Sequence, residues 1–491
     1  MSKVLILGAG IAGHTAAAHL RRKLSREHEV LVVSPNRNYQ WVPSNIWVGI
    51  GRMNVKDVSF PLEPVYKKNG IGYKQAKVVS FHPEGNGTEN KPFVKIEYLS
   101  GEKAGAQENV SYDYLINATG PKLAFELTEG LNPGTNKAYS VCTYDHALHA
   151  SAALHELINT VKYSDRKARI LIGTGHSKAT CQGAAFEYIL NVENELVKLG
   201  VRDQIEITWI SNENELGDFG MDGMLLTYGD KTLKSSEMVE MVFADRGIKW
   251  ILGAGVYKVE DGKVLYENLE GEYKTEEYDF AMLIPSFSGH GFKAFDKEDR
   301  DITDKLFKGF MIVDADYTAR PYEEWSVQDW PETYQNPSYN NVFAPGIAFA
   351  PPHAISRPRK SKNGTDIFPS PPRTGMPSGI TAKLVADNII DNIKNGTSAQ
   401  GIISLRHKGS MGNMGAACIA SAGYGLLDGS GISMTTFPIV PDYNKYKNSH
   451  GRDLKKTFGD IGLAGHWLKL FLHYAFLYKA KMKPFWWLIP E

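Results

Sequence analysis

The sequence has little of what marks several common classes of protein. It contains 3 cysteines in 491 residues, Cys142, Cys181 and Cys418. That number is odd and too small for a secreted disulfide framework, and the spacing is not the paired spacing of a zinc site. The 55 basic residues balance the 55 acidic ones. Nucleic-acid binding requires a basic excess, so we expect no nucleic-acid partner.

Long apolar runs are also missing. No stretch reaches the roughly 18 uncharged apolar residues that a membrane-spanning helix requires. The chain begins MSKVLILGAG, in which a strand pattern starts at Lys3, so we expect no signal peptide. A chain of 491 residues exceeds what one hydrophobic core usually organises, which predicts two or three folding units.

A dinucleotide-binding motif opens the chain. An apolar run leads into Gly8, Gly10 and Gly13, and an alanine-rich helix pattern follows, which is the context that the motif G-x-G-x-x-G requires. Gly8 permits a tight turn, Gly10 lets the backbone approach a pyrophosphate, and Gly13 lets the helix pack on the strand. The alternative is a glycine-rich turn in another kind of α/β protein, and the flanking pattern disfavours it.

The type of nucleotide is indicated by the next strand, HEVLVVSPN. An NAD-binding strand would end in an acid, whereas this one ends in Ser34, and Asn36 supplies a weaker polar contact. This departure disfavours NAD more than it disfavours a flavin, which is held along an extended path by many contacts.

Two later strands carry further flavin-type signals. The first, in YDYLINATG, ends in Ala118, Thr119 and Gly120. The second, in NNVFAPGIAFAPP, ends near Gly346, and Ile347 stands where many flavoenzymes have an acid. The cofactor-binding unit is therefore predicted to be discontinuous. We expect it to comprise residues 1–120 and 300–400, with a second Rossmann-like domain at 121–299 and a C-terminal region at 401–491.

The second domain opens with a degraded copy of the motif, GTGHSKATCQGAAFEY. Lys178 occupies the third glycine position, and the next strand has no acid at its end, so dinucleotide binding is weakened twice. Cys181 lies at the predicted helix start, where the macrodipole favours a thiolate and lowers the pKa. The alternative is a small buried residue that packs the helix on the strand. Cys418 lies among glycines and alanines that leave its sulfur little cover, and spacing alone does not pair it.

In their order along the chain, these motifs resemble those of the sulfide:quinone oxidoreductases, from Lys3 to about Lys483. The matching blocks are ILGAGIAG, YQWVPSNIWVGIG, YDYLINATGPKLAFE, VCTYDHA, the Cys181 helix, VFAPGIAFAPP, PRTG, ACIASAG and a basic aromatic C-terminal segment. The resemblance implies an α/β fold with two Rossmann-like dinucleotide-binding domains of the glutathione-reductase type and a C-terminal amphipathic membrane-binding region. It also implies FAD as the cofactor, with Pro43 and Ser44 among the residues that bind it.

The resemblance further implies that Cys181 and Cys418 are a redox pair on one face of the flavin. Hydrosulfide would attack the bridge between them, and electrons would pass to a quinone on the other face. The product would be polysulfide or elemental sulfur. The alternative is a type II NADH:quinone oxidoreductase of the same fold, which the broken second glycine motif disfavours.

Four more residues bear on the chemistry. Cys142 matches a family cysteine whose role differs among members, and its function stays open. His146 in the same block could act as acid or base, because the unperturbed pKa of histidine lies near neutrality, or it could be structural. Asp218 stands where related proteins have a second histidine, so a relay through two histidines does not carry over directly. Arg373 replaces a lysine common in the PRTG block, which keeps the charge but changes its geometry.

The C-terminal segment HWLKLFLHYAFLYKAKMKPFWWLIPE is predicted to be an interfacial anchor of a peripheral, monotopic membrane protein. Its longest uncharged stretch, Leu470–Tyr478, is well short of the roughly 20 residues that span a bilayer. Aromatic and apolar residues recur at helical spacing, and Trp486 and Trp487 follow. The alternative is a helix packed on the protein's own surface or in the seam of a homo-oligomer, the assembly state that we expect. Lys469 matches a family lysine near the quinone, while His473 stands where close relatives have an acid.

Overall fold

A computed structural model describes residues 1–372, 374–396, 405–423, 425–427 and 429–491. The apolar runs around the first glycine motif form a parallel sheet, whose strands are buried on both faces and are therefore almost continuously apolar. β1 (Lys3–Leu7) lies between β2 (Glu29–Ser34) and β8 (Tyr114–Asn117), and α1 (Ile11–Lys23) connects β1 to β2. The full order is β24-β8-β1-β2-β5-β6-β7, with β5 (Gly72–His82), β6 (Phe93–Tyr98), β7 (Gln107–Ser111) and β24 (Val342–Phe343). The strands from β24 to β5 pair in parallel, whereas β6 pairs antiparallel with both β5 and β7.

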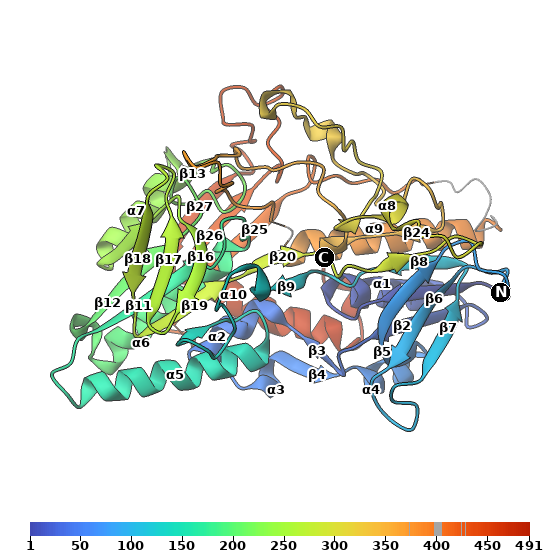
Figure 1. The fold of residues 1–491 in the computed structure, drawn as a ribbon, viewed down its shortest axis with the longest axis horizontal. Helices are drawn as coiled ribbons and strands as arrows, with labels where there is room; N and C mark the ends of the chain where they lie inside the picture. Colours follow the sequence, from blue (N-terminus) through green and yellow to red (C-terminus); the bar gives the residue numbers. More distant parts are fainter. Residues whose placement is uncertain (373, 397–404, 424, 428) are drawn as a thin grey trace.

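A second parallel sheet forms the core of the inserted domain, at the left of Figure 1. Its order is β10-β19-β11-β12-β15, with β10 (Ala138–Tyr139), β19 (Phe280–Ile284), β11 (Ala168–Thr174), β12 (Ile205–Ile210) and β15 (Ile248–Ile251). The helices of this domain are α5 (Tyr144–Lys162), α6 (Gln182–Leu199) and α7 (Ser235–Asp245), and an antiparallel sheet of β16 (Gly255–Glu260), β17 (Lys263–Glu267) and β18 (Tyr273–Glu277) lies beside it. The expected α/β fold with two Rossmann-like domains is confirmed.

The C-terminal residues share a third sheet with the inserted domain. Its order is β14-β13-β27-β26-β25, in which β13 (Leu225–Tyr228) pairs with β14 (Lys231–Lys234) on one side and, on the other, with β27, more than two hundred positions later. The later strands are β25 (Ala416–Gly423), β26 (Gly429–Thr436) and β27 (Phe458–Gly462). Two helices complete this half of the chain, α9 (Gly375–Lys394), which packs on α1, and α10 (Leu463–Ala480). The region 401–491 is thus joined to the second domain by a shared sheet.

Short elements connect these layers. They are β3 (Asn38–Gln40), η1 (Val42–Ser44), α2 (Asn45–Gly49), α3 (Val55–Val58), β4 (Ser59–Pro61), α4 (Leu62–Asn69), β9 (Lys122–Ala124), η2 (Phe125–Leu127), η3 (Arg202–Gln204), β20 (Ser286–Ser288), β21 (Lys293–Ala294), α8 (Thr303–Leu306), β22 (Phe307–Lys308), β23 (Phe310–Met311), η4 (Tyr322–Glu324), η5 (Val327–Asp329), η6 (Gly346–Ala348) and η7 (Trp486–Leu488). β21 pairs with β5, so the chain contacts the first sheet again before residue 300.

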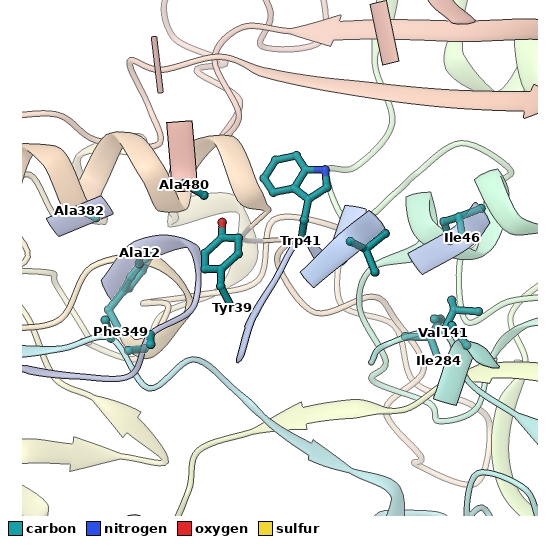
Figure 2. Packing of buried hydrophobic residues seen from close by; sticks show 14 of the residues in the cluster. Ala12, Tyr39, Trp41, Ile46, Val141, Ile284, Phe349, Ala382 and Ala480 are labelled. Carbon is teal, nitrogen blue, oxygen red and sulfur yellow. The ribbon is translucent and has the colours of Figure 1, made fainter. Parts of the chain in front are cut away.

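One hydrophobic cluster links the first domain to α10 (Figure 2). Tyr39 of β3 and Ala12 of α1 lie in it together with Ala480 at the end of α10. Trp41 stacks on Phe476 of α10, with ring centroids 5.1 Å apart. The helix is therefore packed along one face and cannot detach without exposing core. Among the described residues, no helix is both long enough and apolar enough to cross a membrane.

The tail after α10 folds back onto the protein. Trp486 is only 6% exposed, and its ring lies 5.0 Å from that of His19 on α1. Glu491 Oε1 lies 2.6 Å from His19 Nε2 and 2.7 Å from Lys479 Nζ. Within the segment predicted to be an interfacial anchor, Trp486 is therefore buried against the protein, because the contacts of Glu491 with His19 and Lys479 hold the tail on α1.

Candidate active site

The first glycine turn is shaped for a phosphate group. A Cβ on Gly8 would lie 2.2 Å from the oxygen of Ala118, and one on Gly13 would lie 2.0 Å from the oxygen of Gly8, so neither position accepts a side chain. A Cβ on Gly10 would meet no atom within 4 Å, and no side chain caps α1. Open space beside uncapped helix N–H groups fits a pyrophosphate.

The other predicted cofactor residues lie around this turn. Thr119 and Gly120 follow Ala118 at the end of β8. A Cβ on Gly346 would lie 2.9 Å from that of Ala12, which brings η6, with Ile347, against α1.

The end of β2 is divided between a buried and an exposed residue. Ser34 is 1% exposed, and its hydroxyl accepts the N–H of Asn36 at 3.3 Å. Asn36 is exposed and offers its amide to a ligand. Ser34 therefore stabilises the turn. Of the two residues predicted to contact the cofactor here, Asn36 is the accessible one.

Ser44 links the first domain to α10. Its Oγ lies 2.8 Å from Nδ1 of His473, and Ser44 is fully buried, whereas Pro43 before it is half-buried. Burial lowers the pKa of His473 to about 4, so this histidine is neutral at physiological pH. His473, which stands where the resemblance implies an acid, is therefore uncharged.

The second glycine turn has a different shape from the first. β1 and α1 are separated by residues 8–10, whereas β11 and α6 are separated by residues 175–181. The longer turn is covered by the protein's own chain. Lys178 Nζ lies 2.6 Å from Asp366, and the N–H of Phe368 donates to the Ser177 oxygen at 3.1 Å. A tight cradle for a pyrophosphate is missing from this turn.

Asn212 closes the same turn from the other side. It follows β12, near the place where an NAD-binding strand carries its acid. Its side-chain amide donates to the oxygens of Ser177 and Ala179, both at 3.0 Å, and accepts from Gln182 at 2.9 Å. The polar group at this strand end therefore binds the turn itself.

Cys181 and Cys418 meet at the start of α6. Cys181 is the residue before the helix, with φ of 73°, a left-handed conformation that costs an ordinary residue about 1–2 kcal/mol. A Cβ on Gly183 would lie 3.1 Å from Cys418 Sγ, so the sulfur of β25 lies over the first turn of α6. The negative charge of a Cys181 thiolate raises the pKa of both Cys418 and Cys142. All three cysteines are partly exposed, and no disulfide joins them.

The expected lowering of the Cys181 pKa is wrong. Removal from water raises the pKa of Cys181, and a hydrogen bond from the Ala184 backbone offsets only part of the rise. Burial likewise raises the pKa of Cys142 and of Cys418 to about 12. A helix start supplies about half a positive charge, and here the loss of hydration outweighs it. In the reduced protein these thiols are neutral near pH 7.

A buried ion pair lies beside Cys418. Lys469 Nζ of α10 is 2.8 Å from Glu187 Oε2 of α6 and 3.4 Å from the oxygen of Ile419. Glu187 is 5% exposed and also accepts the N–H of Ser421 at 3.2 Å. Glu187 raises the pKa of the Cys418 thiol and Lys469 lowers it. Sequence reasoning missed Glu187, although a carboxylate on the apolar face of AAFEYIL was a detectable signal.

His146 lies at the start of α5, near Cys142 in sequence. Its ring lies edge-on to that of Phe125 at 5.6 Å, and its Nδ1 is buried without a hydrogen-bond partner. Burial lowers its pKa, and the charges that act on it come from Asp145 and His149. The histidine is thus neutral, and its acid–base role stays a prediction.

Asp218 caps a turn after β12. Its Oδ1 accepts the N–H groups of Gly220 at 2.9 Å and Asp222 at 3.2 Å, and the hydroxyl of Ser356. Burial raises its pKa to about 6. A carboxyl that titrates near neutrality keeps a proton-carrying role available. Arg373 lies outside the described residues.

Residues 2–285 match the family model described as pyridine nucleotide-disulphide oxidoreductase. The chain belongs to this family. Membership implies a flavin cofactor, in agreement with the shape of the first turn.

Individual relatives extend this finding. The chain is 29% identical over 392 residues to a sulfide-quinone reductase of Aquifex aeolicus, covering 80% of this chain and 77% of the relative. The crystal structure of the Aquifex aeolicus sulfide:quinone oxidoreductase matches with a TM-score of 0.71 at 27% identity, covering 98% of this chain and 92% of that one. NDH2 of Plasmodium falciparum matches with a TM-score of 0.62 at 14% identity, covering 98% and 96% of the chains, which concerns the fold alone.

Proposed function

We propose that this protein oxidises sulfide at the Cys181–Cys418 pair and passes the electrons through FAD to a quinone. One observation carries the proposal. The second glycine turn, where a nicotinamide dinucleotide would bind, ends in a left-handed cysteine, and the sulfur of a second cysteine lies over the helix that follows. The similarity to sulfide-quinone reductases supports the same assignment.

The cysteines carry the sulfur chemistry in this proposal. In the oxidised enzyme, Cys181 and Cys418 are joined by a disulfide. Hydrosulfide attacks one sulfur, the S–S bond breaks, and the products are a persulfide on one cysteine and a thiolate on the other. The bound flavin supplies a two-electron acceptor that delivers the electron pair to a quinone. Joining the persulfide to the thiolate would re-form the bridge one sulfur longer, with loss of the persulfide proton and of two electrons, for which the flavin is the acceptor. Repeated attack on the re-formed bridge would lengthen the sulfur chain, which would leave as polysulfide or elemental sulfur.

The surrounding residues set the charge at this site. The high pKa of the Cys418 thiol means that a thiolate there needs a compensating positive charge. Lys469, in its ion pair with Glu187, is the nearby cation. An ammonium has three N–H donors, and the contacts to Glu187 and Ile419 use two. We propose that the third bonds a quinone oxygen, which would bring the quinone close to Cys418 and not to the opposite face of the flavin that the resemblance implies.

FAD is the flavin that fits the first domain best. The open space at Gly10 would accept its pyrophosphate, and the exposed Asn36 would be available to its ribose. The assembly that we propose is a homo-oligomer attached to a membrane surface through α10, because a quinone is dissolved in lipid.

The competing function is NADH:quinone oxidoreduction on the same fold. It requires a dinucleotide cradle in the second domain, and that turn is long and covered by residues 366–370. Steady-state reduction of a soluble quinone by the purified protein distinguishes the two functions. We expect sulfide to support turnover and NADH to support none. Turnover with NADH and none with sulfide would reverse the assignment.

A further inference from the structure

The solvent face of α10 carries no charge. The residues between Leu463 and Ala480 that are exposed are all apolar or aromatic: Ala464, Trp467, Leu468, Phe471, Tyr474 and Tyr478. The two lysines of this helix are buried in ion pairs, Lys469 at 12% and Lys479 at 7% side-chain exposure. A helix in contact with water ordinarily presents polar side chains on its outer face. This face therefore indicates an apolar environment.

A second apolar element lies beside the start of this helix. Of the described residues 425–427 between β25 and β26, here called the turn, Leu426 is 74% exposed and Leu427 is 87% exposed. The indole N–H of Trp467 donates to the Leu426 oxygen at 2.6 Å, and His466 Nε2 lies 2.6 Å from the Gly425 oxygen. A hairpin turn in water is usually built from glycine and small polar residues. Two adjacent exposed leucines, held against the apolar face of α10, extend that face.

We infer that Leu426 and Leu427 insert into the membrane as a second anchor beside α10. This inference rests on the proposed reduction of a lipid-soluble quinone. The turn and α10 then form one docking surface, defined by Leu426, Leu427, Trp467, Leu468, Phe471 and Tyr474.

The occupant of this surface is a bilayer with anionic headgroups. Aromatic rings and leucines suit the interface between headgroups and acyl chains. Exposed Lys481 and Lys483 lie just beyond α10, where each adds about 1 kcal/mol of attraction to an anionic surface. If this surface instead formed a dimer interface, Lys481 and Lys483 of one chain would approach the same lysines of the other chain. Only an antiparallel arrangement of the two α10 helices would avoid this.

The position of the turn has a consequence for the site. Leu426 follows the strand that carries Cys418, and the buried contacts of Lys469 and His466 tie this strand to α10. Insertion of the turn places the Lys469 side of the site toward the lipid, from which a quinone enters.

Flotation with vesicles tests the inference on the full-length flavin-loaded protein. Vesicles of phosphatidylcholine and phosphatidylglycerol are mixed with wild type and with the double variant Leu426→Asp/Leu427→Asp. We expect the partition coefficient of the variant on vesicles to be lower by about tenfold or more, because two leucine side chains no longer enter the apolar phase. Flavin content and flavin bleaching by sulfide remain as in wild type. Leu148→Asp, at a leucine 50% exposed on α5, is the matched control and floats normally.

Several outcomes would overturn the inference. One is a double variant that floats like wild type. Another is a wild-type dimer that the double variant converts to monomer without loss of flotation, which would make the surface a subunit seam. A wild type that does not float would end the docking claim, while sulfide bleaching would still report separately on the proposed function. If the aspartates impaired folding, Leu427→Trp should gain fluorescence that nitroxide-labelled lipids quench, and an unquenched signal would contradict insertion.

Discussion

At the scale of single residues, the proposed sulfur chemistry depends on two cysteines that meet at the start of α6, Cys181 before the helix and Cys418 of β25. The left-handed conformation of Cys181 is unfavourable for a residue that only packs a helix on a strand, and conformations of this kind cluster at functional sites. The sequence placed Cys181 at a helix start, and this is what the structure contains. The contact between the first turn of α6 and Cys418 was not predictable from spacing, because it depends on how β25 packs on α6.

Cys181→Ala and Cys418→Ala should each lower sulfide-dependent quinone reduction at least about a thousandfold, because the pair acts as a unit. Flavin should stay bound, since neither side chain belongs to the first glycine turn. Cys142→Ala is the matched control and should lose less. Absorbance spectra give flavin content, and quinone reduction gives turnover. Near-native turnover in either of the first two variants would exclude the disulfide mechanism.

Glu213 provides a pH-dependent test of the second domain. It is fully buried after β12, and burial, together with nearby Asp218, raises its pKa from 4.5 to about 8. The folded state therefore binds this proton more tightly than the unfolded chain does. The stability it contributes is complete below pH 4.5 and is lost as the pH rises toward 8.

Glu213→Gln removes this titration while keeping partners for Ser211 and the Phe219 N–H. Relative to wild type, the variant should gain up to ~1.4 kcal/mol of stability for each pH unit across that range. Melting temperatures of both proteins from pH 5 to pH 9 measure the effect. A difference in melting temperature that stays constant with pH would show that Glu213 does not titrate there.

At the scale of elements, substitutions in the first glycine turn can test cofactor binding and folding separately. A Cβ on Gly10 meets no protein atom, whereas one on Gly13 would collide with the backbone of Gly8. Gly10→Val should therefore fold with a near-normal melting temperature but lack flavin. Gly13→Val should lower the melting temperature itself. Full flavin occupancy in Gly10→Val, read from its visible absorbance, would contradict the prediction that the pyrophosphate binds at this turn.

The tail after α10 is a second element, and the structure places it differently from the sequence-based prediction. Its amphipathic pattern was readable from the sequence, but Trp486 packs on His19 where His19 bonds Glu491, and these residues are far apart in sequence. Glu491→Ala leaves the charge of Lys479 buried and unpaired and should reduce stability by about 3 kcal/mol. The double variant Glu491→Ala/Lys479→Met should recover part of this loss in thermal unfolding. A single variant as stable as wild type would show that the tail does not clamp α1.

At the scale of the whole molecule, local motifs predicted the architecture better than the contacts between its parts. Two strand-turn-helix motifs predicted two Rossmann-like domains because each is a short-range pattern. The third sheet was not predicted, since Thr227 pairs with Phe458 across the chain and no local pattern encodes that. The closure of the second turn by Asp366 and Asn212 is likewise tertiary, although Lys178 in place of a glycine indicated that the turn was altered.

The central claim is that sulfide, not a nicotinamide dinucleotide, reduces the flavin through the cysteine pair. The most direct measurement is anaerobic mixing of the purified holoenzyme with sulfide and, separately, with NADH, while the absorbance of the oxidised flavin is followed in time. We expect rapid bleaching by sulfide in wild type, no bleaching by sulfide in Cys181→Ala, and no bleaching by NADH in either protein. Bleaching of the wild type by NADH, with no response to sulfide, would contradict it.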